Sequence, residues 1–239
     1  PDGPGEPLLA PSVFPEAAAQ ELAQLLAALS SSAPLLIVLG DNGCGKTATL
    51  RALCRSVMCA SRAAKLLVVD FRRTLLGVVE GPQLAGYAMS PVTLEAELVA
   101  ALDELSARLP GPGVSQQELR DRSWWSGPEI YVIVDDYDLV AGASGSPLAA
   151  LADLLPHARD IGLHVVIARR SGGAARAMFD PVLTRMRDLG AMGLLMSADT
   201  DEGVLMGGVR SAPLPPGRGV LVQRGRAATI VQIGWCEPS

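Results

Sequence analysis

The sequence is poor in aromatic residues, in charged residues and in histidine. Only 4% of its 239 residues are aromatic and 19% are charged, whereas 49% are hydrophobic, with alanine and leucine predominant. This composition is typical of a helix-rich soluble protein whose core is filled by small side chains. The two histidines, His157 and His164, have no evident partners in the sequence, and we interpret both as structural rather than catalytic.

Long apolar runs are also absent. No stretch of the sequence approaches the roughly 18–20 residues that a membrane-spanning helix requires. Because the sequence starts at Pro1 rather than at a methionine, we expect it to be part of a longer protein. The missing membrane segment therefore says little about that parent protein.

The few cysteines lack the spacing of a metal site. They are Cys44, Cys54, Cys59 and Cys236. Cys44 lies within a glycine-rich loop where a disulfide would be awkward, so the sequence indicates a reducing, cytosolic compartment. The net charge of −5 argues against a surface that coats nucleic acid, although it does not exclude a local basic patch.

One segment has the pattern of a phosphate-binding loop. The run Gly40-Asp41-Asn42-Gly43-Cys44-Gly45-Lys46-Thr47 matches G-x-x-x-x-G-K-[ST], between an apolar run of strand length and a predicted helix. The glycines let backbone N–H groups converge on phosphates, and the helix N-terminus adds partial positive charge. Lys46 would reach the β- and γ-phosphates, and the Thr47 hydroxyl would ligate Mg²⁺. The sequence therefore predicts a site for ATP and Mg²⁺.

Predicted strands and helices alternate along the rest of the chain. Strands are expected at Leu35–Leu39, Lys65–Asp70, Glu129–Val134, Leu163–Ala168 and Leu194–Met196, with a terminal hairpin over Gly219–Ile233. Helices are expected at Glu16–Leu29, Ala48–Met58, Thr93–Leu109 (Thr93 as N-cap), after the capping box that starts at Ser115, at Pro147–Ala158 and at Pro181–Leu189.

This alternation predicts an α/β fold, a RecA-like P-loop NTPase with a mostly parallel sheet and helices on both faces. Residues 1–13, rich in proline and glycine, are interpreted as a linker or lead-in. Residues 14–239 contain no second linker, and we expect them to form a single domain.

Two consecutive aspartates follow the strand Glu129–Val134. A P-loop NTPase needs a carboxylate at the end of a neighbouring strand to hold Mg²⁺, and Asp135 has that place. The alternative, an aspartate that only caps the strand, is disfavoured by the phosphate loop upstream. Many ATPases of this class next have a glutamate that polarises the attacking water, but here Asp136 is one methylene shorter. Since catalytic positioning is sensitive at the ångström level, we expect slow turnover and leave open whether the domain is an active enzyme. Asp138 is a weaker substitute for the missing glutamate.

Several other residues allow two interpretations. Arg169, after the strand Leu163–Ala168, stands where a γ-phosphate sensor is common; it could stabilise transition-state charge or pair with a carboxylate. Arg218 could be an arginine finger or a turn residue. Trp124 and Trp125 could anchor a partner or plug the local core.

Seven segments together resemble a known family. They are the phosphate loop, Phe71–Leu76, Ser123–Ile130, Val134–Leu139, Ala158–His164, Ala168–Gly173 and Pro215–Val220. In this order they resemble the C-terminal ATPase domain of EccC, the FtsK/SpoIIIE-type motor of actinobacterial type VII (ESX) secretion systems. The resemblance covers nearly the whole chain from Leu35 on. The phosphate loop is generic, whereas the Trp-Trp and Asp-Asp-Tyr-Asp segments are distinctive.

The resemblance implies a string of ATPase domains in a ring, tethered by N-terminal helices to the cytoplasmic face of the inner membrane. It implies that this domain binds other ATPase domains of the motor and the C-terminal signal of secreted WXG100-type substrates. The family's C-terminal domains are degenerate relative to the first, and the departures at Asp136 and Arg169 fit that pattern. An apolar cluster of Leu205, Met206 and Val209 is our guess for the substrate groove.

Two other functions share the phosphate loop. An FtsK-type DNA translocase would need positive channel loops and a DNA-reading module, and neither is evident in this acidic sequence. A small-molecule kinase would need an arginine-rich lid and an acceptor pocket, and no lid is evident. We therefore expect no nucleic acid partner.

Overall fold

The computed structural model of the chain describes residues 24–29, 33–142, 145–173 and 179–233. These residues contain ten strands: β1 (Leu35–Leu39), β2 (Lys65–Val69), β3 (Leu84–Ala88), β4 (Ile130–Val134), β5 (Leu163–Arg169), β6 (Met192–Met196), β7 (Val204–Met206), β8 (Val209–Arg210), β9 (Arg218–Val222) and β10 (Thr229–Gln232). The α-helices are α2 (Lys46–Ala60), α3 (Pro91–Ala107), α4 (Gln116–Asp121), α5 (Tyr137–Val140), α6 (Ala158–Ile161) and α8 (Pro181–Asp188). Residues 24–29 are also helical. Short 3₁₀ segments are η2 (Gly81–Gln83), η3 (Pro147–Leu151), η4 (Leu155–His157) and η5 (Thr200–Glu202).

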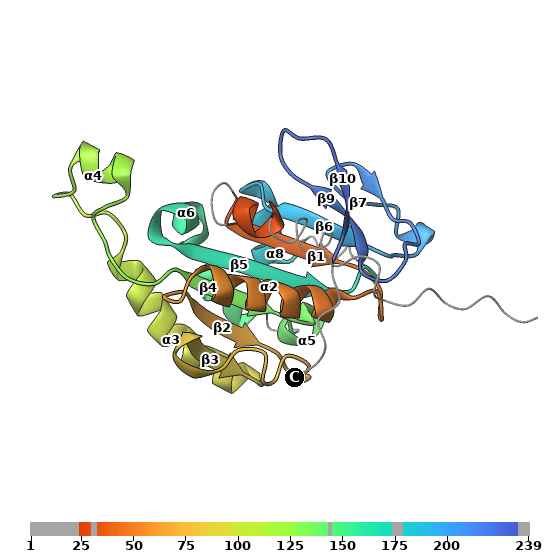
Figure 1. Ribbon diagram of the computed structural model, residues 1–239, viewed down its shortest axis with the longest axis horizontal. Coiled ribbons are helices and arrows are strands. Elements are labelled where there is room, and N and C mark those ends of the chain that lie inside the picture. The colour runs from red at the N-terminus through yellow and green to blue at the C-terminus, as the bar shows by residue number, and fades with distance from the viewer. Residues whose placement is uncertain (1–23, 30–32, 143–144, 174–178, 234–239) are drawn as a thin grey trace, which may run out of the picture.

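Eight strands form one sheet in the order β10-β9-β6-β1-β5-β4-β2-β3. The six strands from β6 to β3 are parallel to their neighbours, and the β9–β10 hairpin adds an antiparallel edge. β7 and β8 form a separate antiparallel pair. The carboxyl ends of β1, β4 and β5 lie at one edge of the sheet, and this edge carries the phosphate loop, Asp135, Asp136 and Arg169 (Figure 1).

The sheet is covered on both faces because its central strands are apolar throughout. In β1, Leu35, Ile37 and Leu39 belong to one buried cluster, and Leu36 and Val38 belong to the other. The first cluster includes apolar residues of α3 and α8, and the second includes those of α2 and of residues 24–29. Figure 1 shows α2 crossing one face of the sheet. The predicted α/β fold with a mostly parallel sheet and helices on both faces is confirmed.

Two of the helix predictions need correction. The long helix near residue 93 begins at Pro91, because Ser90 caps it by accepting from the Thr93 N–H, and Thr93 is the third helical residue of this capping box. The predicted helix Pro147–Ala158 is replaced by two 3₁₀ segments, η3 and η4, followed by α6. Pro156 explains the interruption, since a proline inside a helix removes a donor and clashes with the preceding turn.

Other expectations fall partly or wholly outside the described residues. The lead-in of residues 1–13 and most of the predicted helix Glu16–Leu29 lie outside them. Within the described part of the chain, no helix is both long and apolar enough to cross a membrane.

The tryptophan pair has a structural role. The indole of Trp124 donates to the Arg108 carbonyl at 2.7 Å, and that of Trp125 donates to the Asp160 carbonyl at 2.7 Å. The buried guanidinium of Arg108 lies over the Trp125 ring, 4.4 Å from its centroid. Both indoles are half-buried and belong to neither of the two hydrophobic clusters, so they hold the chain by hydrogen bonds and a cation–π contact rather than as a core plug.

The two histidines also have structural environments. His164 is buried, its ring is stacked on Tyr131 with the centroids 4.2 Å apart, and its Nδ1 lies 3.2 Å from the Leu29 carbonyl oxygen. His157 is exposed in η4.

The guess of a substrate groove at Leu205, Met206 and Val209 is wrong for its first two members. Leu205 and Met206 are buried in the β7–β8 pair, within the main hydrophobic cluster, and Val209 packs against the same cluster. Apolar side chains that the fold itself covers are not available to a partner.

Candidate functional site

The phosphate-loop segment connects β1 to α2 at the carboxyl edge of the sheet. Gly45 is the N-cap residue of α2, and its φ of 108° is a conformation that glycine adopts readily. At Gly40 a Cβ atom would lie 2.6 Å from Cys44 Sγ, so a side chain there would displace the loop. No side chain caps α2 and its first turn has no acidic residue. Its leading N–H groups, which lack intrahelical acceptors, therefore suit an anionic ligand.

The loop is fixed from outside as well as by its own glycines. The Asp41 N–H donates to the Ser197 carbonyl at 2.8 Å, and the Gly217 N–H donates to the Cys44 carbonyl at 2.8 Å. Burial raises the pKa of the Cys44 thiol, so this residue packs rather than reacts. Asn42 and Gly43, at the tip of the loop, are exposed.

Lys46 is the basic residue of the loop. Its ammonium donates to the Asp41 carbonyl oxygen at 2.8 Å, and the residue is only 6% exposed. An ammonium carries three N–H groups, so its contact with one neutral carbonyl leaves further donors for a phosphate.

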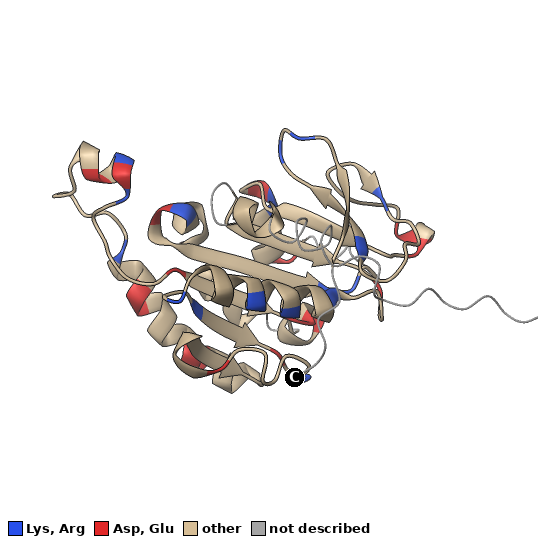
Figure 2. Ribbon diagram, in the orientation of Figure 1, with Lys and Arg blue, Asp and Glu red and all other residues tan. Residues whose placement is uncertain are grey.

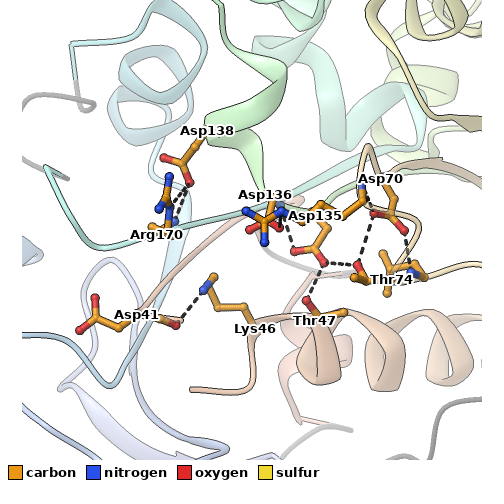
Figure 3. Close-up of polar contacts among 11 residues, drawn as sticks. Asp41, Lys46, Thr47, Asp70, Thr74, Asp135, Asp136, Asp138 and Arg170 are labelled. Atoms are coloured by element: carbon orange, nitrogen blue, oxygen red, sulfur yellow. Dashed lines mark hydrogen bonds and ion pairs between the residues drawn. The ribbon is translucent and has the colours of Figure 1, made fainter. Parts of the chain in front are cut away.

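Asp135 joins the loop to β4 (Figure 3). The Thr47 hydroxyl donates to Asp135 Oδ2 at 2.6 Å, and the Thr74 hydroxyl lies 3.1 Å from the same oxygen. The other oxygen, Oδ1, accepts from the Asp136 N–H at 3.0 Å. Burial raises the pKa of Asp135, and the Thr47 hydrogen bond offsets part of that rise. The two predicted magnesium ligands, Thr47 and Asp135, are therefore in direct contact.

Asp136 has a strained backbone and an ion-pair partner. Its φ of 45° is unusual for a residue with a side chain. Its Oδ2 lies 3.0 Å from Arg72 Nε, which the sequence analysis did not assign to the site. Arg72 extends from the loop after β2, and the buried carboxylate of Asp70 stabilises this loop by accepting from the N–H groups of Arg72 and Leu75.

The end of β5 meets the phosphate loop on the other side. Arg169 is paired with Asp138, whose Oδ1 accepts from Arg169 Nη2 at 2.7 Å and from Nε at 3.1 Å. The buried Ser171 hydroxyl donates to the carboxylate of Asp41. The carboxylate pairing of Arg169, one of the two interpretations, is the one that the structure contains. Arg218 donates from Nε to Gln232 at 3.3 Å, on the β9–β10 hairpin.

Four contributors were not predicted from the sequence: Asp70, Arg72, Thr74 and Ser171. Arg72, Thr74 and Ser171 belong to segments that carry the family resemblance, but polar residues in a loop have no periodic pattern that assigns partners. Only the pairing of β2 with β4 brings this loop beside Asp135 and Asp136.

The donor set fits magnesium with phosphate. Among the described residues, no group of three or more histidine, cysteine, aspartate or glutamate side chains is placed to hold a metal ion. Mg²⁺ at nucleotide sites commonly takes only one or two carboxylates, with phosphates and water as its other ligands. One carboxylate and one hydroxyl beside an uncapped helix N-terminus match that requirement.

Comparison with known proteins gives a consistent result. No protein-family model matches the chain. It is 59% identical over 207 residues to the ESX-4 secretion system protein EccC4 of Mycobacterium tuberculosis, covering 86% of this chain and 17% of the relative. It is 40% identical over 206 residues to the ESX secretion system protein EccC of Thermomonospora curvata, covering 85% of this chain and 16% of the relative. The chain thus spans about a sixth of the length of these relatives.

Solved structures agree. The cytoplasmic domain of the Thermomonospora curvata type VII secretion ATPase EccC superposes with a TM-score of 0.82 at 39% identity, covering 87% of this chain and 24% of that one. A structure of ATPases 2 and 3 of the same protein, in complex with a signal sequence peptide, superposes with the same TM-score and identity. The match covers 87% of this chain and 38% of that one.

Proposed function

Because the chain belongs to the EccC family of type VII (ESX) secretion ATPases, we propose that it is an ATP-binding domain of a protein-secretion motor. The observation that carries the proposal is the 2.6 Å hydrogen bond between Thr47 and Asp135. It joins the start of α2 to the end of β4, two elements far apart in sequence, in the arrangement that holds Mg²⁺ at a triphosphate.

Each residue of the loop has a physical role in this proposal. The backbone N–H groups of Asn42, Gly43 and Gly45 and of the first turn of α2 would bind the phosphates, whereas those of Gly40 and Asp41 already donate to carbonyl groups of the protein. With a nucleotide bound, Lys46 would donate to the β- and γ-phosphates in place of the Asp41 carbonyl, and Thr47 and Asp135 would hold Mg²⁺. When bound, the metal neutralises charge that develops on the phosphates.

Hydrolysis is proposed to be slow. The candidate water-activating residue, Asp136, is shorter than glutamate, has a strained φ and is paired with Arg72. Each of these features hinders placement of a carboxylate oxygen against a water molecule near the γ-phosphate.

The proposed partners follow from the relatives. A relative's ATPases 2 and 3 bind a signal sequence peptide, and we assign to this chain recognition of the C-terminal signal of WXG100-type substrates. The assembled motor would be a ring at the cytoplasmic face of the inner membrane, with residues 14–239 as one of its domains. Figure 2 shows basic residues distributed over several elements and interspersed with acidic ones, which does not favour a nucleic acid partner.

Calorimetric titration with Mg-ATP tests the nucleotide site. Lys46→Ala should weaken binding at least tenfold, about 1.4 kcal/mol, because the β/γ-phosphate charge contact is removed. Lys65→Ala is the matched control: Lys65 begins β2, at the other end of the sheet, and its substitution should leave the affinity unchanged. Equal ATP affinity in the wild type and Lys46→Ala would refute the assignment of the loop.

A further inference from the structure

Two consecutive arginines leave β5 beside the phosphate loop, and the structure gives them different environments. Arg169 is the last residue of the strand and lies opposite Leu39 in β1, directly before the loop begins. Arg170 is the next residue.

The guanidinium of Arg169 is held in an ion pair within the protein. Its side chain is 7% exposed, and both Nε and Nη2 donate to Asp138 Oδ1. Its Nη1 has no hydrogen-bond partner among the described residues, but this atom is buried and out of reach of solvent. A phosphate could reach this guanidinium only by breaking a buried ion pair, and removal of one partner from such a pair is strongly unfavourable.

Arg170 is fixed at its backbone and loosely held at its tip. Its N–H donates to Asp138 Oδ2 at 3.0 Å, whereas its Nε lies 3.7 Å from the same oxygen, beyond hydrogen-bond distance. The side chain is 46% exposed. Together with Asp41, Asn42 and Gly172, Arg170 lines a cavity of about 530 Å³ beside the phosphate loop.

The segment after β5 cannot drift away from the loop. The Ser171 N–H donates to the Gly40 carbonyl at 3.2 Å, and the Ser171 hydroxyl donates to the Asp41 carboxylate. The Gly40 N–H in turn donates to the Arg169 carbonyl at 3.3 Å. Figure 3 places Arg170 and Asp138 near Asp41 and Lys46, on the opposite side of the site from Thr74.

We propose that Arg170, and not Arg169, contacts the terminal phosphate of the bound nucleoside triphosphate and makes the site distinguish a triphosphate from a diphosphate. This proposal rests on the proposed ATP site. Two N–H groups of the Arg170 guanidinium donate to phosphate oxygens, and Asp138 is the counter-ion of Arg170 when no nucleotide is bound. Arg169 has a structural role, because its buried ion pair with Asp138 stabilises the fold.

The experiment measures affinities for ADP and for a non-hydrolysable ATP analogue, both with Mg²⁺, so that turnover plays no part. In Arg170→Ala the analogue should bind at least tenfold more weakly while ADP affinity is unchanged, so the ratio of the two affinities falls tenfold. Arg170→Lys, which keeps the charge but not the fork, should lose less. Because Arg170 is half exposed, neither substitution should impair folding.

Arg169→Lys is the matched control. It should lower the melting temperature, because the buried fork on Asp138 is lost, and leave the affinity ratio of the folded protein unchanged. An unchanged ratio in Arg170→Ala, or a fall confined to Arg169→Lys, would overturn the assignment while leaving the ATP site intact. Failure of the wild type to bind either nucleotide would overturn the ATP site and this assignment together.

Discussion

At the scale of single residues, Asp135 tests the metal site most directly. Asp135→Asn removes the negative charge that would face Mg²⁺ but keeps an oxygen for Thr47 and Thr74. We expect the gain in ATP affinity that Mg²⁺ provides to fall about tenfold, with affinities in the presence of a chelator unchanged. The amide nitrogen would face the Asp136 N–H, so the hydrogen bond at Oδ1 is lost and the melting temperature should fall modestly. A Mg²⁺ effect equal to that of the wild type would contradict the ligand assignment.

Asp136 is proposed to affect the rate of ATP hydrolysis rather than the affinity for ATP. We expect the wild type to hydrolyse ATP well below the ~1 s⁻¹ low end of typical enzymes. Asp136→Glu should raise turnover, because the added methylene extends the carboxylate toward the water, with little change in ATP affinity. Steady-state phosphate release measures both. Fast hydrolysis by the wild type would show that this interpretation of Asp136 is wrong.

At the scale of elements, Asp138 ties the start of α5 to the end of β5. Its carboxylate accepts from the side chain of Arg169 and from the backbone N–H of Arg170. Asp138→Asn should destabilise the fold by about 3 kcal/mol, because a buried guanidinium loses its counter-charge. Denaturant unfolding measures the change, and Asp153→Asn at an exposed position is the control.

The same ion pair predicts a pH dependence. Burial by itself raises the pKa of Asp138, but the Arg170 N–H and the Arg169 charge outweigh it and hold the pKa below its ordinary value. A carboxylate whose folded-state pKa is depressed contributes stability that is fully present above its unfolded pKa of about 3.9 and is lost as the pH falls through the folded-state pKa. As the pH falls below about 4, the free energy of unfolding should therefore decrease more in the wild type than in Asp138→Asn. Parallel curves for the two proteins would show that Asp138 does not carry this dependence.

At the scale of the whole molecule, the net charge of −5 favours a signal peptide over DNA as the macromolecular partner. A signal peptide held by apolar anchors should bind with little dependence on salt, whereas binding to a phosphate backbone falls steeply as salt rises. We expect a labelled C-terminal tail of a WXG100-type protein to bind modestly at low and at physiological salt. Labelled duplex DNA should not bind measurably at physiological salt.

One titration of both ligands at two salt concentrations decides between these partners. A scrambled tail peptide is the control for sequence-independent adhesion. Tight duplex binding with a steep salt dependence, together with no binding of the tail, would favour a DNA translocase over a secretion motor.

The sequence by itself determined the layers of the fold and the residue types of the site. Apolar runs such as Leu35–Leu39 can be buried only between two layers of helices, and a strand, a glycine-rich loop and a helix in succession predict a phosphate cradle. These features are local, so a short window of sequence carries all the information they need. The helix predicted over Pro147–Ala158 is wrong for a reason that is also local, because Pro156 interrupts it.

The tertiary structure alone decided which polar residues meet. Arg72 contacts Asp136 only because β2 lies beside β4, and Ser171 contacts Asp41 only because β5 lies beside β1. The sequence could not assign different roles to Arg169 and Arg170, because the two residues are adjacent and of one type. Only the structure shows that Arg169 is buried and paired with Asp138 whereas Arg170 is half-exposed. Strand order is set by long-range packing, which no local pattern encodes, and in this protein that order builds the surroundings of the two aspartates.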